Sequence, residues 1–223
     1  MGAAALREQF DSFLGGPLDW RTRPLPETIP SGIVDIYLPR GALTEIVGPP
    51  SSGRTSLLLS ILASATERQE SCALVDAEDS FDPVSAAAAG VCLDRLLWVR
   101  CAHNAEHALK AADLLIQGGG FGLAILDLGD TPPATARRIS LTSWFRLRRA
   151  VENTPSVLVS MARQPLARTC ASLVLECARD HATWSGAAPW GAPSARLLRH
   201  VRARATSTQR RRACSHVFTA AAI

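Results

Sequence analysis

Short apolar runs alternate along the chain with segments in which apolar residues recur at helical spacing. The first pattern is typical of strands buried in a sheet, and the second indicates the apolar face of a helix. The predicted strands cover residues 42–47, 72–76, 95–100, 122–128, 156–161, 171–177 and 195–201, and the predicted helices cover 55–65, 83–89, 104–117 and 141–151. This order predicts an α/β fold: a mostly parallel sheet with helices on both faces, extended by antiparallel strands at the C-terminal end.

The two ends of the chain differ from this central region. Residues 3–14 carry apolar side chains at helical spacing, and the proline-rich stretch that follows predicts an extended connection. The predicted helix either caps the core of its own domain or docks on a neighbouring subunit. We expect three parts: a helix and connection over 1–31, one core domain over 32–204, and a basic, disordered tail over 205–223.

Charge is distributed unevenly along the 223 residues. Residues 1–136 carry 9 basic and 17 acidic side chains, and residues 137–223 carry 15 basic and 3 acidic, so the two parts have net charges of −8 and +12. A strongly basic part favours an anionic partner, and nucleic acid is the first candidate. Alternatively, the two parts neutralise each other across an internal or subunit contact.

Several protein classes are disfavoured. No run is long and apolar enough to span a membrane, and the amino terminus lacks the features of a secretory signal. The six cysteines are scattered without metal-ligand spacing, and several lie in apolar runs, so we expect reduced core thiols. These features predict a cytoplasmic protein.

The segment Gly48–Thr55, with the sequence GPPSSGRT, lies between a predicted strand and a predicted helix. In that context the pattern Gly-x4-Gly-Lys-Ser/Thr is the P-loop, whose backbone N–H groups and helix N-terminus face a polyphosphate. Arg54 stands where the pattern has lysine, although 23 of the 24 basic side chains are arginine, so this replacement alone carries little weight. The predicted nucleotide-binding residues are Gly48, Pro49, Pro50, Ser51, Ser52, Gly53, Arg54, Thr55 and Ser56.

Carboxylates follow two of the predicted strands. Strand 72–76 leads into an acidic cluster that includes Glu78, and Asp127 lies near the end of strand 122–128. Acidic side chains at the carboxyl ends of parallel strands lie where α/β proteins bind ligands. In P-loop proteins, an aspartate at the position of Asp127 orders the water shell of Mg²⁺ beside the hydroxyl of the loop, which is that of Thr55 in this chain. The predicted metal site is therefore Mg²⁺ at Thr55 and Asp127.

Together these motifs resemble the ATPase core of the RecA recombinase family. The matching segments are Leu38-Pro39-Arg40-Gly41, the P-loop, Asp76 to Pro83 with the pattern DAE-x-x-x-DP, and the strand ending in Asp127. The Asp76 to Pro83 segment is the most diagnostic, because a generic P-loop protein has no reason to carry it. The resemblance implies ATP and Mg²⁺ as cofactors, and it gives Glu78 the catalytic role of polarising the water that attacks the γ-phosphate.

The chain also departs from that family. Arginine presents a larger planar fork than lysine, so we expect weakened nucleotide binding and a greater loss of hydrolysis. The two loops that contact single-stranded DNA in the recombinases are replaced here by 130–140 and the short 162–169, and we expect no counterpart of the separate C-terminal domain. In these respects the chain is similar to the short RecA-like proteins related to ImuA and to the cell-division inhibitor SulA, which act as accessory factors in DNA-damage responses.

Two functional hypotheses follow. In the first, the protein is an ATP-binding, DNA-binding accessory of DNA repair, recombination or translesion synthesis in the SOS response, with weak or no ATP hydrolysis. Its predicted contacts with single-stranded DNA are Arg137, Arg138, Arg163 and Arg168. In the second, the fold is retained as a non-catalytic protein–protein adaptor. The expected assemblies are a homo-oligomer or a DNA-polymerase accessory complex. A small-molecule kinase is a third and weaker hypothesis, because no lid-like arginine insertion is evident.

Overall fold

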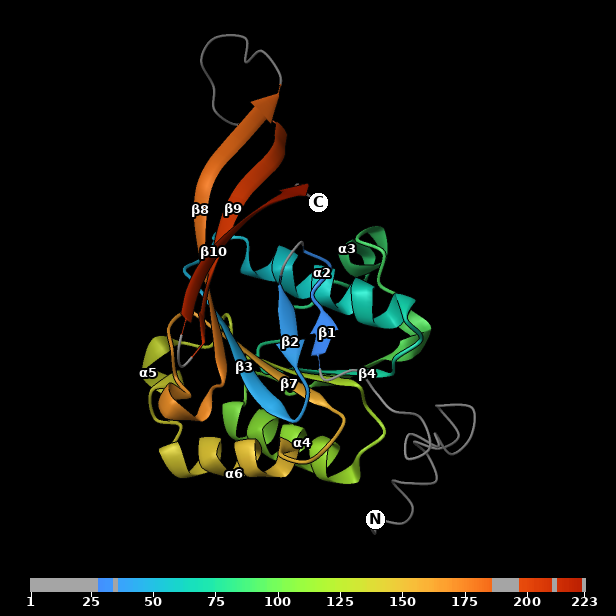
Figure 1. The fold of residues 1–223 in the computed structure, drawn as a ribbon, viewed down its shortest axis with the longest axis vertical. Coiled ribbons are helices and arrows are strands. Elements are labelled where there is room, and N and C mark those ends of the chain that lie inside the picture. The colour runs from blue at the N-terminus through green and yellow to red at the C-terminus, as the bar shows by residue number, and fades with distance from the viewer. Residues whose placement is uncertain (1–27, 34–35, 186–196, 210–211, 222–223) are drawn as a thin grey trace.

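The computed structural model describes residues 28–33, 36–185, 197–209 and 212–221, and from residue 180 onward it describes the backbone alone. The helix predicted over 3–14 lies outside the described residues. The described part is built around one large sheet that has helices on both faces (Figure 1).

Within the described residues, the main sheet has eight strands in the order β10-β9-β8-β3-β7-β6-β4-β5. They are β3 (Ala42–Val47), β4 (Cys72–Asp76), β5 (Leu96–Arg100), β6 (Leu123–Asp127), β7 (Val157–Ala162), β8 (Leu173–Ser185), β9 (Leu197–Gln209) and β10 (Arg212–Ala221). The strands from β8 to β5 in this order are parallel, whereas β9 and β10 pair antiparallel. The predicted parallel sheet with an antiparallel C-terminal extension is thus confirmed.

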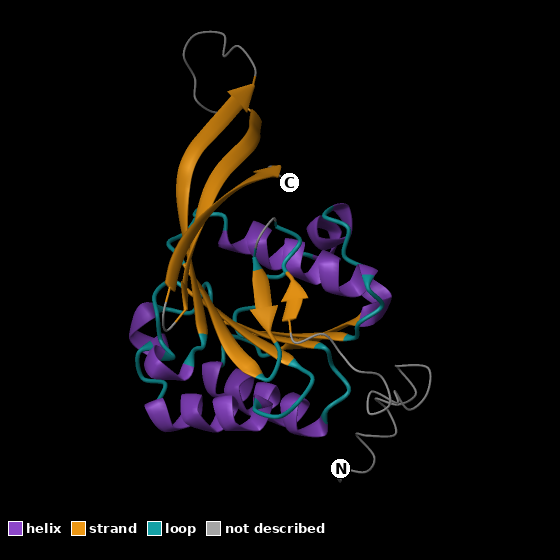
Figure 2. Cartoon of the chain, viewed as in Figure 1, coloured by secondary structure: helices purple, strands orange, loops and turns teal. Residues whose placement is uncertain are grey.

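Helices cover the two faces of the parallel part (Figure 2). One face carries α2 (Arg54–Glu67) and α3 (Pro83–Ala88), and the other carries α4 (Ala105–Gly118) and α6 (Leu141–Val151). Three short elements complete the described helical structure: α5 (Pro133–Ala136), η1 (Leu93–Arg95) and η2 (Arg168–Cys170). None of the helices in the described residues has the length and apolarity needed to cross a membrane.

Each face of the sheet has its own apolar core. Ile46 of β3 packs with Leu57 and Leu62 of α2, whereas Leu43 of the same strand packs on the opposite side with the core that contains Trp144 of α6. This alternation follows from the period of two along a strand. Because helices cover both faces, β4, β6 and β7 are buried throughout, which explains why they appear as continuous apolar runs.

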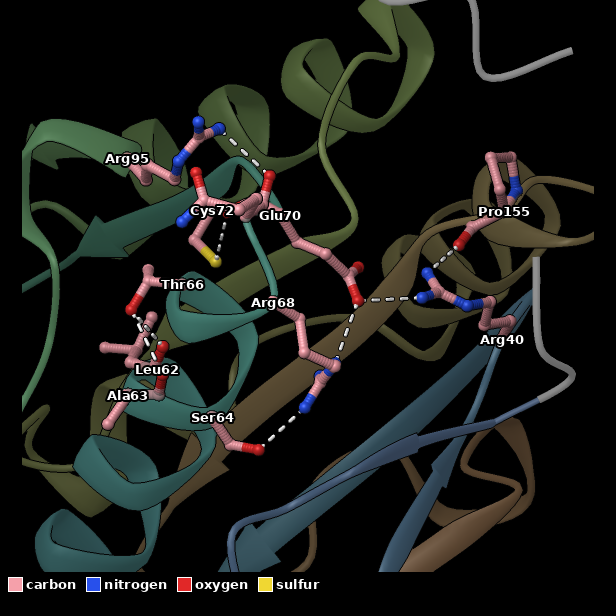
Figure 3. Close-up of polar contacts among 11 residues, drawn as sticks. Arg40, Leu62, Ala63, Ser64, Thr66, Arg68, Glu70, Cys72, Arg95 and Pro155 are labelled. Carbon is pink, nitrogen blue, oxygen red and sulfur yellow. Dashed lines mark hydrogen bonds and ion pairs between the residues drawn. The ribbon is translucent and has the colours of Figure 1, made fainter. Parts of the chain in front are cut away.

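Arg40 ties three turns together at the edge where the parallel strands begin (Figure 3). Its guanidinium donates to the Pro155 carbonyl oxygen at 2.6 Å and to Glu70 Oε1 at 2.9 Å. Arg68, at the end of α2, donates to the same carboxylate oxygen at 3.4 Å. Arg40 precedes β3, Glu70 precedes β4 and Pro155 precedes β7. This cluster therefore connects the segments at the edge of the sheet where the parallel strands begin. The opposite edge, where these strands end, remains available for ligands.

The structure differs from the predicted organisation at both ends of the core. Residues 28–30, predicted as part of an extended connection, form β1 (Thr28–Pro30), which pairs with β2 (Tyr37–Pro39) because Ile29 and Leu38 are fully buried. In place of the disordered tail predicted over 205–223, β9 continues to Gln209 and β10 follows it. Pairing with β8 and β10 provides partners for the backbone of β9, an interaction that the arginine-rich composition does not reveal.

Candidate nucleotide site

The carboxyl ends of β3, β7, β6 and β4 lie side by side at one edge of the sheet. Asp76 and Asp127 are register partners on β4 and β6, and Val47 at the end of β3 is the partner of Ala162 on β7. The P-loop, the acidic segment after β4 and the loops after β6 and β7 therefore emerge from the same edge. This is the position at which open parallel sheets bind ligands.

The P-loop has the backbone form of an anion site. Ser51 and Gly53 adopt left-handed conformations, with φ of 61° and 90°. Left-handed residues within such a turn direct successive N–H groups toward one side, and no side chain caps α2 at Gly53. Gly48 has no room for a side chain, because an added Cβ would lie 2.4 Å from Ser52 Oγ and 2.6 Å from the Cys177 carbonyl oxygen. The loop therefore offers N–H groups and a helix N-terminus to an anion.

Arg54 turns its side chain onto acceptors of the protein itself and is only 5% exposed. Its Nη1 donates to the Gly48 carbonyl oxygen at 2.6 Å. Its Nη2 donates to the Gly129 carbonyl oxygen at 2.7 Å and to Asp130 Oδ1 at 2.9 Å. Residue 129 is glycine where the contact is tight, since a Cβ there would lie 3.2 Å from Arg54 Nε. Arg54 thus links the P-loop to the loop after β6, and Asp130 neutralises its charge.

Asp127 ends β6 as a buried carboxyl group. Burial raises its pKa to about 7, the hydrogen bond from Gly129 N–H at 2.7 Å opposes this increase, and the charge of Asp76 adds to it. Burial therefore disfavours the charged form of Asp127 relative to an exposed aspartate. A cation beside Asp127 would favour its charged form.

Asp76 organises the acidic segment after β4. Its buried carboxylate accepts backbone N–H groups from Glu78, Ser80 and Phe81 at distances of 3.2, 3.1 and 2.9 Å. Trp98 of β5 donates its indole N–H at 3.3 Å. Four donors on one carboxylate fix the path of the segment and hence the position of Glu78.

Glu78, the predicted catalytic residue, has a partner that sequence reasoning missed. Its Oε2 lies 2.9 Å from Nδ1 of His103, which lies between β5 and α4. The side chain of Glu78 is 14% exposed and that of His103 is 71% exposed. His103 has a left-handed backbone with φ of 61°. The sequence gives one signal for this contact: His103 follows a predicted strand, so it is expected at the same sheet edge as Glu78.

The four arginines predicted to contact DNA, Arg137, Arg138, Arg163 and Arg168, are all exposed. Arg137 Nη2 donates to Gln164 Oε1 at 3.5 Å, which connects the loops after β6 and β7. Arg163 approaches the nucleotide site instead: its Nε donates to the Gly129 carbonyl oxygen at 3.2 Å, and its Nη2 lies 3.8 Å from Asp130 Oδ1. The structure therefore brings the two loops together but directs Arg163 partly inward.

Glu45 is a second residue that sequence reasoning missed. It is fully buried in β3, and its Oε1 accepts N–H groups of Leu166 and Ala167 in the loop after β7 at 2.8 and 2.9 Å. Its Oε2, like the hydroxyl of its register partner Ser160, has no hydrogen-bond partner within the described residues. Burial raises the pKa of Glu45, and the two N–H bonds oppose this. A carboxylate inside an apolar strand was the available signal, because buried glutamates are rare.

The residues present fit a polyphosphate accompanied by Mg²⁺. The loop offers backbone N–H groups, and the buried Ser52 hydroxyl has no partner among the described residues. The described residues contain no group of three or more His, Cys, Asp or Glu side chains that could hold a metal. Mg²⁺ keeps several waters and needs one or two carboxylates plus substrate phosphates, which Asp127 and the exposed Thr55 hydroxyl can accommodate. Arg54 does not fit the role of the P-loop lysine, because its Nη1 and Nη2 groups already donate hydrogen bonds to three acceptors within the protein.

A parallel sheet with a P-loop between its first strand and helix, and an aspartate that ends a neighbouring strand, has the architecture of a P-loop core. Residues 28–133 match the family model of the RecA N-terminal domain. This chain therefore contains a RecA-family core, as the sequence motifs predicted.

Curated relatives agree with this assignment. Protein RecA of Rhodospirillum rubrum is 46% identical over 90 residues, which cover 40% of this chain and 24% of that protein. Protein RecA of Deinococcus radiodurans is 44% identical over 90 residues, with the same coverage of both chains. Protein RecA of Chloroflexus aurantiacus is 33% identical over 154 residues, covering 60% of this chain and 44% of that protein. The chain thus spans less than half the length of these relatives.

Proposed function

We propose that the protein is a cytoplasmic, ATP-binding and DNA-binding accessory of DNA repair, in recombination or translesion synthesis, that hydrolyses ATP weakly or not at all. The observation that carries the proposal is the state of Arg54. The P-loop keeps an anion-binding backbone, but its one cationic side chain is held by three acceptors of the protein. Such a loop can hold a polyphosphate, while stabilisation of the transferred phosphoryl group is weakened.

The proposed roles follow from these positions. Backbone N–H groups beyond Pro50 are proposed to hold the phosphates, since Pro49 and Pro50 have no N–H to donate, and the Ser52 N–H donates to the Pro49 carbonyl oxygen at 3.2 Å. Thr55 and Asp127 hold the water shell of Mg²⁺, which when bound neutralises charge on the phosphate oxygens. Because burial raises the pKa of Asp127 to about 7, the binding of Mg²⁺ should release a proton from this carboxyl group near neutral pH.

Glu78 is proposed to orient the attacking water, as the family resemblance implies. His103 holds the Glu78 carboxylate at 2.9 Å, and Asp76 fixes the segment on which Glu78 lies. Glu78→Gln should therefore leave nucleotide affinity within about twofold of wild type and lower any ATP turnover at least about tenfold.

The DNA-binding part of the proposal is supported by charge and by loop geometry. The exposed Arg137, Arg138 and Arg168 lie in segments after adjacent parallel strands, and Arg137 connects the two loops through Gln164. Binding to phosphates by arginines releases counterions, so affinity for single-stranded DNA should fall steeply with added salt. We propose that the DNA-binding protein acts in a homo-oligomer or in a DNA-polymerase accessory complex.

One titration tests both ligands. Fluorescently labelled ATP with Mg²⁺ is titrated with the full chain, with and without single-stranded DNA, and ATP turnover is measured in parallel. We expect saturable ATP binding with turnover near the background rate. Undetectable ATP binding at millimolar ATP, or DNA affinity that is absent at low salt or independent of salt, would exclude the proposal.

Paired variants test the DNA contacts. Changing Arg137 and Arg138 together to glutamine should reduce the slope of log affinity against log salt by about 1.4 for single-stranded DNA, because two phosphate contacts are lost. Changing Arg149 and Lys110, which are exposed on α6 and α4, removes the same charge and should leave the salt dependence nearly unchanged.

A non-catalytic protein–protein adaptor is the second candidate. The internal neutralisation of Arg54 by Asp130 favours it, since the P-loop then needs no nucleotide to satisfy its cation. The adaptor hypothesis predicts no ATP turnover and no functional effect of Glu78→Ala. A measurable ATPase rate that Glu78→Ala abolishes would rule it out.

A further inference from the structure

Asp130 lies between two arginines that come from different parts of the sheet edge. Its Oδ1 is 2.9 Å from Nη2 of Arg54, at the start of α2, and 3.8 Å from Nη2 of Arg163, in the loop after β7. Both guanidinium groups also donate to the Gly129 carbonyl oxygen, at 2.7 and 3.2 Å. The loop after β6 therefore presents two adjacent oxygen acceptors to both arginines.

This arrangement resembles the way in which arginines bind a phosphate. The planar guanidinium fork matches two oxygens of a carboxylate or phosphate, and charged hydrogen bonds of this kind are stronger than neutral ones. Arg54 is almost completely buried, whereas the side chain of Asp130 is 52% exposed. Arg54 is thus fixed near the P-loop, and Asp130 is the partner that can move away.

We propose that Asp130 is an internal counter-ion that competes with a bound polyphosphate for Arg54, and thereby sets the affinity of the P-loop for nucleotide. The inference rests on the proposed nucleotide binding. A phosphate oxygen that pairs with Arg54 replaces the Asp130 carboxylate, and the separation of Arg54 from Asp130 reduces the net affinity. The same displacement removes a partner from Arg163, so the loop after β7 responds to nucleotide through this carboxylate.

The test compares nucleotide affinity in Asp130→Asn with that in wild type, using the full chain and labelled ATP with Mg²⁺. Removal of a half-exposed ion pair should make binding about fivefold tighter in Asp130→Asn. Glu152→Gln, which removes one negative charge from an exposed pair with Arg148 at the end of α6, serves as the matched control and should bind within twofold of wild type. Equal or weaker binding by Asp130→Asn would overturn the inference.

The dependence on Arg54 is tested by adding Asp130→Asn to Arg54→Gln. Glutamine carries no charge for Asp130 to neutralise, so the change at residue 130 should then alter nucleotide affinity less than twofold; a fivefold gain in this background would also overturn the inference. Without nucleotide, Arg54→Gln and Asp130→Asn should affect the urea midpoint of unfolding non-additively, because the two side chains are bonded to each other. Additive changes would contradict the pairing itself.

The two proposals fail differently in these experiments. If wild type binds ATP and Asp130→Asn binds no more tightly, the competition is wrong and nucleotide binding stands. If neither protein binds ATP at millimolar concentration, although circular dichroism shows that both are folded, both the proposed function and the competition are wrong.

Discussion

Two aspartates end neighbouring parallel strands at the same register, yet their surroundings differ. Asp76 accepts four hydrogen bonds, three from backbone N–H groups and one from Trp98. Asp127, its register partner, accepts one hydrogen bond, from Gly129, and burial raises its pKa to about 7. The loop after a strand, rather than the strand itself, therefore decides how many hydrogen-bond donors a buried carboxylate receives.

This difference separates two tasks. The loop after β4 is folded around Asp76, which makes it a fixed platform for Glu78. The loop after β6 supplies Asp127 with little compensation and contributes Asp130 to Arg54 instead. We infer that the first loop preserves the geometry of the site, whereas the second determines how the site responds to cations and phosphate.

The largest expected effect comes from Asp76→Ala. The change leaves four donors without their acceptor in a buried place, so the free energy of unfolding should fall by about 3 kcal/mol. Urea unfolding followed by circular dichroism measures this loss. Asp79→Asn is the control, because asparagine tolerates the left-handed backbone at φ 56° and should cost less than about 1 kcal/mol. A loss below about 1 kcal/mol for Asp76→Ala would remove the basis of the comparison.

A second, pH-dependent effect is expected at Glu45, which has two donors on one oxygen and none on the other. Burial raises the pKa of Glu45, so its folded form holds a proton that the unfolded chain releases at lower pH. Its contribution to stability is therefore greatest below the unfolded pKa and is lost as pH rises through the folded pKa. Glutamine keeps an acceptor oxygen without this dependence.

The measurement is urea unfolding of wild type and Glu45→Gln between pH 4 and pH 8. The variant should gain stability relative to wild type as pH rises, by at most about 1.4 kcal/mol per pH unit, the value for one proton. Glu176→Gln, exposed on the adjacent β8, should show no such trend. A difference that stays constant, or that favours wild type at higher pH, would show that the two N–H bonds outweigh burial.

The smallest expected effect comes from His103→Ala. Because the imidazole is 71% exposed, its loss should cost less than about 1 kcal/mol of stability. If ATP is turned over, the rate should fall severalfold while nucleotide affinity stays constant, because His103 positions Glu78 without contacting the nucleotide. His103→Asn retains a donor and tolerates the left-handed backbone, so it should recover part of the rate. Equal rates for wild type and His103→Ala would assign the contact to structure alone.

The order of the elements and the motifs could be predicted from the amino-acid pattern alone. Strands 42–47 and 72–76 and helix 141–151 have the predicted bounds, because continuous apolar runs and helical spacing are local consequences of burial. The P-loop pattern, Glu78 and Asp127 are candidates for the site on sequence grounds, since each lies at a fixed place relative to a strand. The pairing of β9 with β10 could not be predicted from the sequence, because the arginine-rich segment shows no local periodicity that would reveal an antiparallel partner.

The contacts of the site side chains, in contrast, follow from the way the chain folds in three dimensions. Arg54 and Asp130 lie 76 positions apart, Glu45 and Ala167 lie 122 apart, and His103 and Glu78 lie 25 apart. These pairs arise because parallel strands bring their carboxyl ends to one edge, where loops distant in sequence meet. The P-loop arginine thus changes from a simple replacement of lysine into one partner of an ion pair, and that pairing depends on the register of β3, β7 and β6.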